Sequence, residues 1–430
     1  MSAADLYKVI IEVKGETMDV RLFRYLLKNT SSAVVMSGCT WDKGAQEQVR
    51  YAYTCEMVHN SAGKSQQSRF EQSSCSSPLN LFIMGSFSVE DAQRLIDTIR
   101  CGSVNTVILP YVVPIQRFLI LKTLVSKEIM DKDLLDFIQT PYLYLKKTAV
   151  KKIFFIYGNG SLFDKTECGM YPGNYFEFQD KETLDMIEEM EGYRIPVMKA
   201  GYIIDNRTLF YFGHYGADLP MIRQFISRYA RTLRLEKIDE REIQKMMLVY
   251  QKVFADSRLD TLTVFCSPTE ITASQTDCVF HAIVVDKEDL CHTDIEMDEG
   301  RCSVKCMLYN DYDVCHCHRT QEAELRAGIL LLGNVKLRKY LKEIRERYKI
   351  VEQQIRAVTI PNCGNIQNWD KELTELDVGK NAVFWICPLH TQMPDQVMRE
   401  IKSKNARYRI IGLNDDYGCC FNGFLTEKTE

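Results

Sequence analysis

The amino-acid sequence predicts an α/β fold, an αββα sandwich in which two mixed sheets pack face to face and helices flank both outer sides. Three observations predict it. A β-α-β unit lies in the first third of the chain, and a second set of strands and helices fills the last third. Hydrophobic residues make up 46% of the sequence, enough for a large core. No segment of linker composition divides the chain, so we expect one domain over residues 1–430.

Strands dominate the N-terminal half, residues 1–157. Apolar alternation or short apolar runs mark strands at Tyr7–Val13, Val20–Leu27, Ala33–Ser37, Leu79–Met84, Thr106–Leu109 and Lys152–Tyr157. Apolar residues recur at helical spacing in Ser88–Arg100, directly before the strand at Thr106. Strand, helix and strand in this order form the β-α-β unit.

Residues 158–256 read as a helical insertion, because amphipathic stretches lie near Leu219–Leu233 and Glu240–Val253. Strands return in the C-terminal half, residues 257–430. They are expected at Thr261–Cys266, Val279–Val285, Cys302–Tyr309, Tyr312–His318, Gly328–Leu332, Ala357–Pro361, Ala382–Ile386 and Tyr408–Leu413. Two helices are expected among them, at Lys336–Lys349 and Asp395–Lys404.

Composition excludes several classes of protein. The N-terminus has no signal-peptide pattern, and prolines and charges interrupt the most apolar window, Val107–Val125, so we expect a cytoplasmic protein without membrane spans. A net charge of −4 creates no general attraction for nucleic acid. In such a chain the 16 cysteines are expected to be reduced core thiols or metal ligands rather than disulfides.

Five stretches carry a family resemblance: LFIMGSFSVEDAQRL, VNTVILPYVVPIQRFLIL, ILLLGNVKL, TIPNCGNIQNW and TQMPDQVM. Together with the order of elements, they resemble the metallo-β-lactamase superfamily over nearly the whole chain, particularly its nuclease-like bacterial members. In that family a buried strand ends in a His-x-His-x-Asp-His loop, whose side chains help to hold two metal ions. The resemblance therefore implies where a metal site should lie.

The residues at the implied ligand positions are mostly not ligands. The family's loop falls on Ser86, Ser88, Glu90 and Asp91, and its later metal-bridging aspartate falls on Asn334. The remaining histidine positions fall on Asn362, Cys363 and Met393, whereas turn-forming neighbours such as Gly333, Gly364 and Pro394 match. The resemblance thus implies a degenerate site with no dinuclear zinc centre and no catalytic residue that can be named with assurance.

Two other interpretations of this loop stay open. Ser88 is a favourable helix N-cap, and Asp91 three residues later completes a capping box, a role that needs no metal. Alternatively, Glu90, Asp91 and neutral oxygens could hold Mg²⁺ or Ca²⁺, which prefer oxygen ligands.

A cysteine- and histidine-rich hairpin is predicted over residues 291–318. If Asn310 and Asp311 form its turn, alternation places four cysteines on one face, namely Cys302, Cys306, Cys315 and Cys317. They could hold one structural Zn²⁺, with Cys291, His292, His316 and His318 as alternate ligands. Buried free thiols explain the same pattern, because cysteine also packs as a small apolar residue.

The helix at residues 336–349 has a basic face that could contact nucleic acid or an acidic partner, or could simply be solvated. Isolated histidines at His214 and His390 are expected to have packing or surface roles.

Three functions follow. The resemblance favours a catalytically degenerate binding or regulatory subunit with protein partners in a bacterial multi-component system, such as phage defence. The alternatives are a metal-dependent phosphodiesterase or nuclease with a diverged site, and a zinc-stabilised module that binds nucleic acid.

Overall fold

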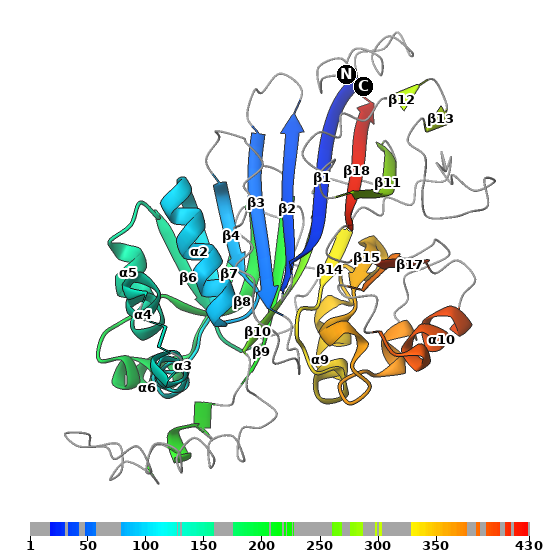
Figure 1. Cartoon of the computed structure of the whole chain (residues 1–430). Coiled ribbons are helices and arrows are strands. Elements are labelled where there is room, and N and C mark those ends of the chain that lie inside the picture. The colour runs from blue at the N-terminus through cyan, green and yellow to red at the C-terminus, as the bar shows by residue number, and fades with distance from the viewer. Residues whose placement is uncertain are drawn as a thin grey trace.

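A computed structural model describes residues 18–30, 33–42, 48–56, 79–126, 128–129, 131–158, 175–205, 208–216, 219–220, 222–225, 227, 260–268, 276–286, 297–298, 301–302, 328–375, 384–387, 393–404, 409–413 and 417–428. The protein is α/β (Figure 1). In its N-terminal half the elements are β1 (Met18–Thr30), β2 (Ala33–Asp42), β3 (Gln48–Glu56), β4 (Leu79–Met84), α2 (Val89–Cys101), β5 (Val104–Pro110), α3 (Pro114–Ser126), α4 (Lys132–Gln139), α5 (Pro141–Lys146) and β6 (Lys152–Ile156).

Residues 219–220, 222–225 and 227 are helical, within the amphipathic stretch expected near Leu219–Leu233. Strands and one helix make up the labelled elements in the described part of residues 158–256. They are β7 (Tyr175–Phe178), α6 (Lys181–Glu191), β8 (Val197–Asp205) and β9 (Thr208–Tyr215). We expected a helical insertion here, and this expectation is wrong for these residues. β8 and β9 lie in the middle of the main sheet, between β6 and the first strand of the C-terminal half. Every residue of β9 is buried, so both faces of the strand favour apolar side chains and the alternation that marks a half-exposed strand is weak.

The C-terminal half returns to strands and helices; its last strand, β18, was not predicted from the sequence. Its described elements are β10 (Thr261–Pro268), β11 (Thr276–Asp286), β12 (Met297–Asp298), β13 (Arg301–Cys302), β14 (Gly328–Leu331), α9 (Leu337–Tyr348), β15 (Ile355–Thr359), β16 (Phe384–Cys387), α10 (Asp395–Lys404), β17 (Arg409–Gly412) and β18 (Tyr417–Lys428), with short 3₁₀ turns η3 (Glu352–Gln354), η4 (Pro361–Gly364) and η5 (Lys371–Glu375).

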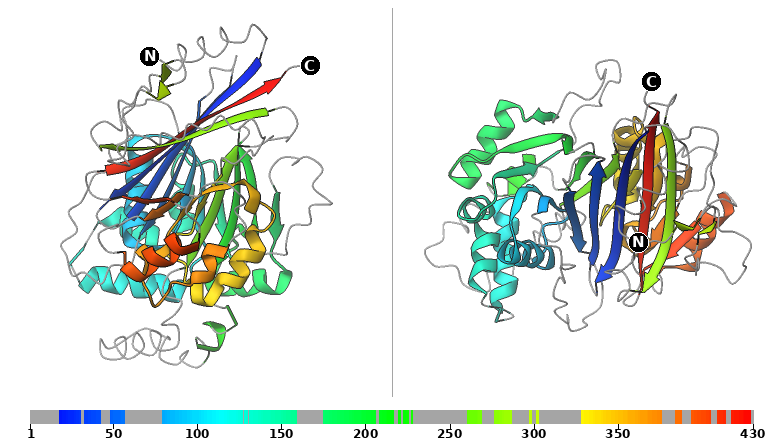
Figure 2. Two further views of the ribbon diagram at one scale, coloured as in Figure 1. Left: turned by 90° about the vertical axis from the view of Figure 1, so that its right-hand side faces the viewer. Right: turned by 90° about the horizontal axis from the view of Figure 1, so that it is seen from above.

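One continuous 16-stranded sheet joins both halves, in the order β11-β18-β1-β2-β3-β4-β5-β6-β8-β9-β10-β14-β15-β16-β17, with β7 beside β8. The sequence predicted two mixed sheets; in the structure β6, β8 and β9 join the strands of the two halves into one sheet. The last strand, β18, lies antiparallel to the first, β1, and Figure 2 shows the two side by side.

Three buried apolar clusters define the layers. The first contains side chains from strands of both halves, for example Ile83 of β4, Leu262 of β10 and Ile329 of β14, so the two halves of the sheet face each other across it. The second lies between α2–α6 and strands of the N-terminal half, and the third lies between α9, α10 and strands of the C-terminal half. This layering is compatible with an αββα sandwich.

Strand direction brings loops from both halves to one edge. β4, β5 and β6 are parallel, and β14 to β17 are parallel, so each set has its carboxyl ends together. A bridge joins Ser86, just after β4, to Thr261 at the start of β10, which runs antiparallel to β14 and begins beside the end of that strand. Leu262 N–H also donates a hydrogen bond to Gly85 O at 2.7 Å. The loops that the sequence singled out therefore meet at this junction.

Candidate functional site

The N-terminal side of the junction is the turn from β4 into α2. Ser88 is the N-cap of α2, and its hydroxyl accepts a hydrogen bond from Asp91 N–H at 3.0 Å, which confirms its predicted capping role. Glu90 lies in the first turn of α2, where an acidic side chain is favoured by the helix dipole.

The carboxylate of Asp91 is the centre of a buried polar cluster. Thr54 of β3 donates its hydroxyl to Oδ1 at 2.6 Å, and Ser86 donates its hydroxyl to Oδ2 at 2.5 Å. Arg94, one helical turn further on, places Nη1 3.3 Å from Oδ1. Asp91 and Ser86 are completely buried, so each of these bonds is made in a medium that screens charge weakly.

Cys55 joins this cluster to the C-terminal side of the junction. Its buried thiol interacts with the Ser86 hydroxyl and with the backbone N–H of Asn334. Burial raises the pKa of the Cys55 thiol, and the nearby Asp91 carboxylate raises it further. Cys55 is therefore a neutral thiol at physiological pH and a poor nucleophile.

Two residues after β14 close the junction. Gly333 has φ +55°, and a Cβ there would lie 2.8 Å from Cys55 Sγ and 2.9 Å from Tyr53 Oη, so only glycine fits. Asn334 is 5% exposed, and its side-chain nitrogen and oxygen have no hydrogen-bond partner within the described part of the chain.

The turn after β15 supports Asn334 from the other side. Asn362 adopts the left-handed conformation with φ +49°, and its Nδ2 donates a hydrogen bond to the backbone O of Asn334 at 2.9 Å. The backbone of Cys363 follows in η4. Met393, just before α10, lies against Gly364: a Cβ there would be 3.5 Å from Met393 Cγ.

The structure thus brings Ser86, Asp91 and Asn334 to one junction, with the turn of Asn362 beside it, although more than 240 residues separate Ser86 from Asn334. Sequence reasoning missed Thr54, Cys55 and Arg94. The alternation of Tyr51, Tyr53 and Cys55 could have indicated strand β3, which contains Thr54 and Cys55.

These residues do not fit a dinuclear zinc centre. Zinc pairs require imidazole or thiolate donors and a bridging carboxylate with free lone pairs. Here the oxygens of Asp91 already accept two hydroxyl hydrogen bonds, and the Arg94 guanidinium supplies the positive charge beside it. Across the described ranges, no group of three or more potential ligands could hold a metal ion.

His214 has the packing role that the sequence predicted. It lies at the end of β9, 2% exposed, where its Nδ1 accepts a hydrogen bond from Gly158 N–H at 3.1 Å. An accepting Nδ1 places the proton on Nε2, which lies 3.3 Å from Asp260 Oδ1. His214 of β9 thus contacts Asp260 at the start of β10 and Gly158 after the end of β6. His390 lies outside the described residues.

The predicted cysteine hairpin falls almost entirely outside the described residues. Only Cys302 is placed: it lies in β13 and pairs with Met297 of β12. Cys291, His292, Cys306, Cys315, His316, Cys317 and His318 are not described, so the zinc prediction stays a prediction. Of the described cysteines, Cys55, Cys266 and Cys387 are buried and Cys101 is exposed, and none of these four forms a disulfide.

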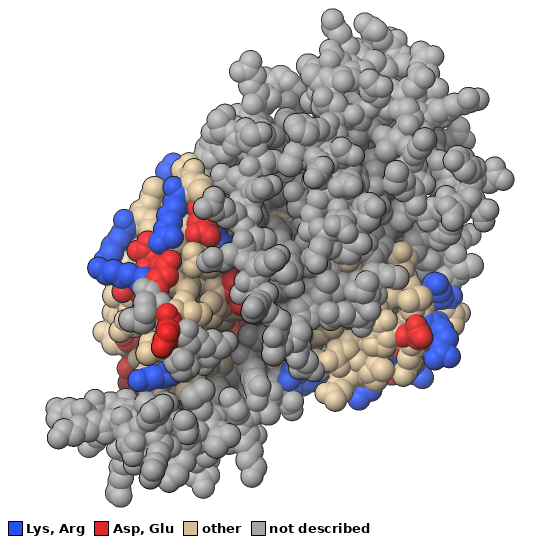
Figure 3. Space-filling view, viewed as in Figure 1, with Lys and Arg blue, Asp and Glu red and all other residues tan. Residues whose placement is uncertain are grey.

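The basic helix at residues 336–349 is confirmed as α9, but its basic residues do not all face solvent. Arg347 is buried, with Nη1 3.2 Å from the Tyr211 hydroxyl and its guanidinium over the Tyr211 ring. Arg338, Lys339, Lys342 and Lys349 are exposed, and Figure 3 shows basic and acidic side chains together on this flank. The exposed face is therefore mixed in charge.

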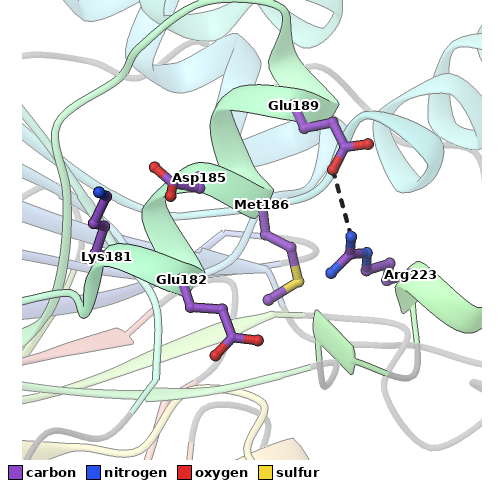
Figure 4. A pocket seen from close by; sticks show the side chains of 6 residues that line it. All are labelled: Lys181, Glu182, Asp185, Met186, Glu189 and Arg223. Carbon is purple, nitrogen blue, oxygen red and sulfur yellow. Dashed lines mark ion pairs between the residues drawn. The ribbon is translucent and has the colours of Figure 1, made fainter.

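A surface depression of about 430 Å³ lies beside α6 (Figure 4). The depression is lined by charged residues of α6, namely Lys181, Glu182, Asp185 and Glu189, and by Met186 and Arg223. Its ion pair, Glu189–Arg223 at 3.8 Å, joins two largely exposed side chains. Exposed ion pairs of this kind contribute little to the stability of a protein. The residues that line the depression lie on other elements than the Asp91 cluster.

Comparisons with known proteins return no match, whether to family models, to curated proteins or to solved structures. Among the helices of the described part, none combines the length and apolar character that crossing a bilayer requires. Fold and site therefore define an α/β protein whose two halves meet at a buried polar junction around Asp91.

Proposed function

We propose that this chain is a catalytically inactive protein of the metallo-β-lactamase type that acts as a binding or regulatory subunit. The state of Asp91 carries the proposal. Its carboxylate accepts bonds from Thr54 and Ser86 and is paired with Arg94, so its oxygens are used in structural contacts within the N-terminal half. A hydrolase of this type needs such a carboxylate to hold a cation that activates water.

The opposite side of the junction supports the same proposal. Asn334 stands where the family resemblance places the bridging aspartate, and a neutral amide cannot balance the charge of two cations. An oxygen-only Mg²⁺ or Ca²⁺ site would need six or more oxygens, some of them from water, and among the protein ligands carboxylate oxygens with free lone pairs. The cluster offers the carboxylate, two hydroxyls and one amide, and the hydroxyls already donate to the carboxylate.

A metal and activity assay tests the proposal. Purified protein is analysed for Zn, Mn and Mg, then incubated with each metal and bis(p-nitrophenyl) phosphate, beside an Asp91→Asn variant and a Glu90→Gln control. We expect no metal at the junction and no turnover above background in any sample. Two metals per chain, together with hydrolysis that disappears in Asp91→Asn, would overturn the proposal in favour of a diverged phosphodiesterase.

A structural zinc ion at the predicted hairpin is compatible with this function and is tested separately. The four-cysteine face predicts about one zinc per chain, lost when Cys306 and Cys315 are changed to serine. The matched control is Cys101→Ser, because Cys101 is an exposed thiol elsewhere. If the wild type binds no zinc, these cysteines are packing residues.

A further inference from the structure

His214 links two strands that are not neighbours in the sheet. β8 lies between β6 and β9, yet Nδ1 of His214 in β9 accepts a hydrogen bond from the backbone N–H of Gly158, two residues after the end of β6. The two nitrogens are 3.1 Å apart, and the His214 side chain is buried. This bond forms only while Nδ1 carries no proton, because a protonated ring nitrogen has no lone pair with which to accept.

A carboxylate lies on the other side of the His214 ring. Asp260, directly before β10, is also buried, and its Oδ1 lies 3.3 Å from Nε2 of His214. A negative charge at this distance favours a positively charged imidazolium over a neutral ring. The Gly158 N–H therefore favours the neutral form of His214, whereas Asp260 favours the charged form.

Tyrosines stand around this pair. The Tyr157 ring centre lies 5.3 Å from that of His214, and Tyr340 of α9 donates its hydroxyl to Gly216 O in the turn after β9. Tyr215 packs against Tyr340, and burial raises the pKa of Tyr215 well above its usual range. Tyrosine hydroxyls stay neutral between about pH 5 and 8, whereas histidine ordinarily gains its second proton in this range. A proton taken up by this group of side chains in mild acid thus goes to His214.

The neighbours of Gly158 are held more firmly than Gly158 itself. β9 is paired with β8 on one side and with β10 on the other, which fixes the His214 ring. Tyr157 donates its N–H to Met198 O and accepts a hydrogen bond at its hydroxyl from Leu219 N–H, both at 2.8 Å. A second proton on Nδ1 sets two donors against each other, so the contact between Nδ1 and Gly158 is the one that opens.

We propose that His214 is a pH switch that takes up a proton in mild acid and releases Gly158, while Asp260 holds the imidazolium in place. The release acts at the point where the chain leaves β6 toward β7. Its effect is confined to this point, because Tyr157 keeps its own hydrogen bonds to Met198 and Leu219. The switch does not depend on the function proposed above.

Residue-resolved hydrogen exchange of the full-length protein tests the switch. The amides of Gly158 and Tyr157 are compared at about pH 7.5 and about pH 5, after correction for the intrinsic effect of pH on exchange. Gly158 should lose at least about tenfold in protection at the lower pH, because its acceptor is lost. The Tyr157 N–H donates to a backbone carbonyl, so its protection should stay the same.

Two variants identify the groups responsible. His214→Gln keeps an acceptor, since an amide oxygen takes up no proton in this range, so Gly158 should be equally protected at both pH values. Asp260→Asn keeps the histidine but removes the charge that favours the imidazolium. The pH at which Gly158 is released should therefore fall by about one unit or more. His281→Gln, in β11, is the matched control and should behave as the wild type does.

Three results would overturn the switch. The first is equal protection of Gly158 at both pH values in the wild type. The second is a loss of protection that persists in His214→Gln, since another group would then be responsible. The third is a simultaneous loss at Tyr157, which would mean that the whole end of β6 opens. If His214→Gln does not fold, Asp260→Asn decides, because an unchanged midpoint in that variant also contradicts the proposal.

Discussion

Arg94 Nη1 lies 3.3 Å from Asp91 Oδ1, and both side chains are at least nine-tenths buried in the junction between the two halves of the sheet. This pair lies where the family resemblance would place a metal ligand. It is a structural contact, since the positive charge beside the carboxylate comes from the protein itself. Thr54 and Ser86 complete the set of hydrogen bonds to the carboxylate.

Replacing Asp91 with asparagine tests this structural role. Asp91→Asn leaves the Arg94 guanidinium buried without its counter-charge, so the free energy of unfolding should fall by about 3–5 kcal/mol. Glu90→Gln, in the same helical turn, should cost less than about 1 kcal/mol. Urea denaturation monitored by circular dichroism measures both. Equal stability of the two variants would contradict a structural role for Asp91.

Gly333 and Gly158 both have a left-handed backbone, but only Gly333 lies close to Cys55. Replacing each with alanine should therefore lower the free energy of unfolding by different amounts. Gly158→Ala should cost about 1–2 kcal/mol from conformation alone, because a Cβ there meets nothing within 4 Å. Gly333→Ala adds contacts under 3 Å with Cys55 and Tyr53, so its cost should be about 1–3 kcal/mol larger. Thermal unfolding of both variants compares them. Similar losses would mean that the junction is not tightly packed.

The raised pKa of the Cys55 thiol predicts low reactivity. At pH 8, iodoacetamide should modify the exposed Cys101 readily and leave Cys55 unmodified in the folded protein, as peptide mass spectrometry can show. Because the folded state holds this proton more tightly than the unfolded state, its contribution to stability is full below about pH 8.5 and declines as pH rises further. In Cys55→Ala that part of the decline should be absent.

The buried pair of Arg117 and Glu191 predicts a strong effect far from the junction. Glu191→Gln leaves a buried guanidinium unbalanced and should destabilise the protein by about 3–5 kcal/mol. Glu189→Gln breaks the exposed pair with Arg223 and should cost less than about 1 kcal/mol. The double change Arg117→Met with Glu191→Leu should recover most of the loss. If it does not, hydrogen bonds of Arg117 such as that to Gln139 O matter more than the charge.

Local patterns predicted much of the fold. α2, with Ser88 as its N-cap, follows from apolar residues at helical spacing, and β4, β5 and β14 follow from short apolar runs. The same patterns missed β3, β8, β9 and β18. Their character depends on burial by distant neighbours: β9 is buried along its whole length between β8 and β10.

The sequence by itself determined the chemical groups of the Asp91 cluster and its neighbours: the hydroxyls of Thr54 and Ser86, the carboxylate of Asp91, the amide of Asn334 and the thiol of Cys55. Only the tertiary structure decided what the carboxylate faces. Arg94 lies three residues after Asp91 in the same helix, a spacing that the sequence already contains. Thr54, however, reaches Asp91 from another strand, and Asn334 reaches Cys55 from the other half of the chain. Contacts of this kind depend on how strands stack across the core, which no local spacing of residues encodes.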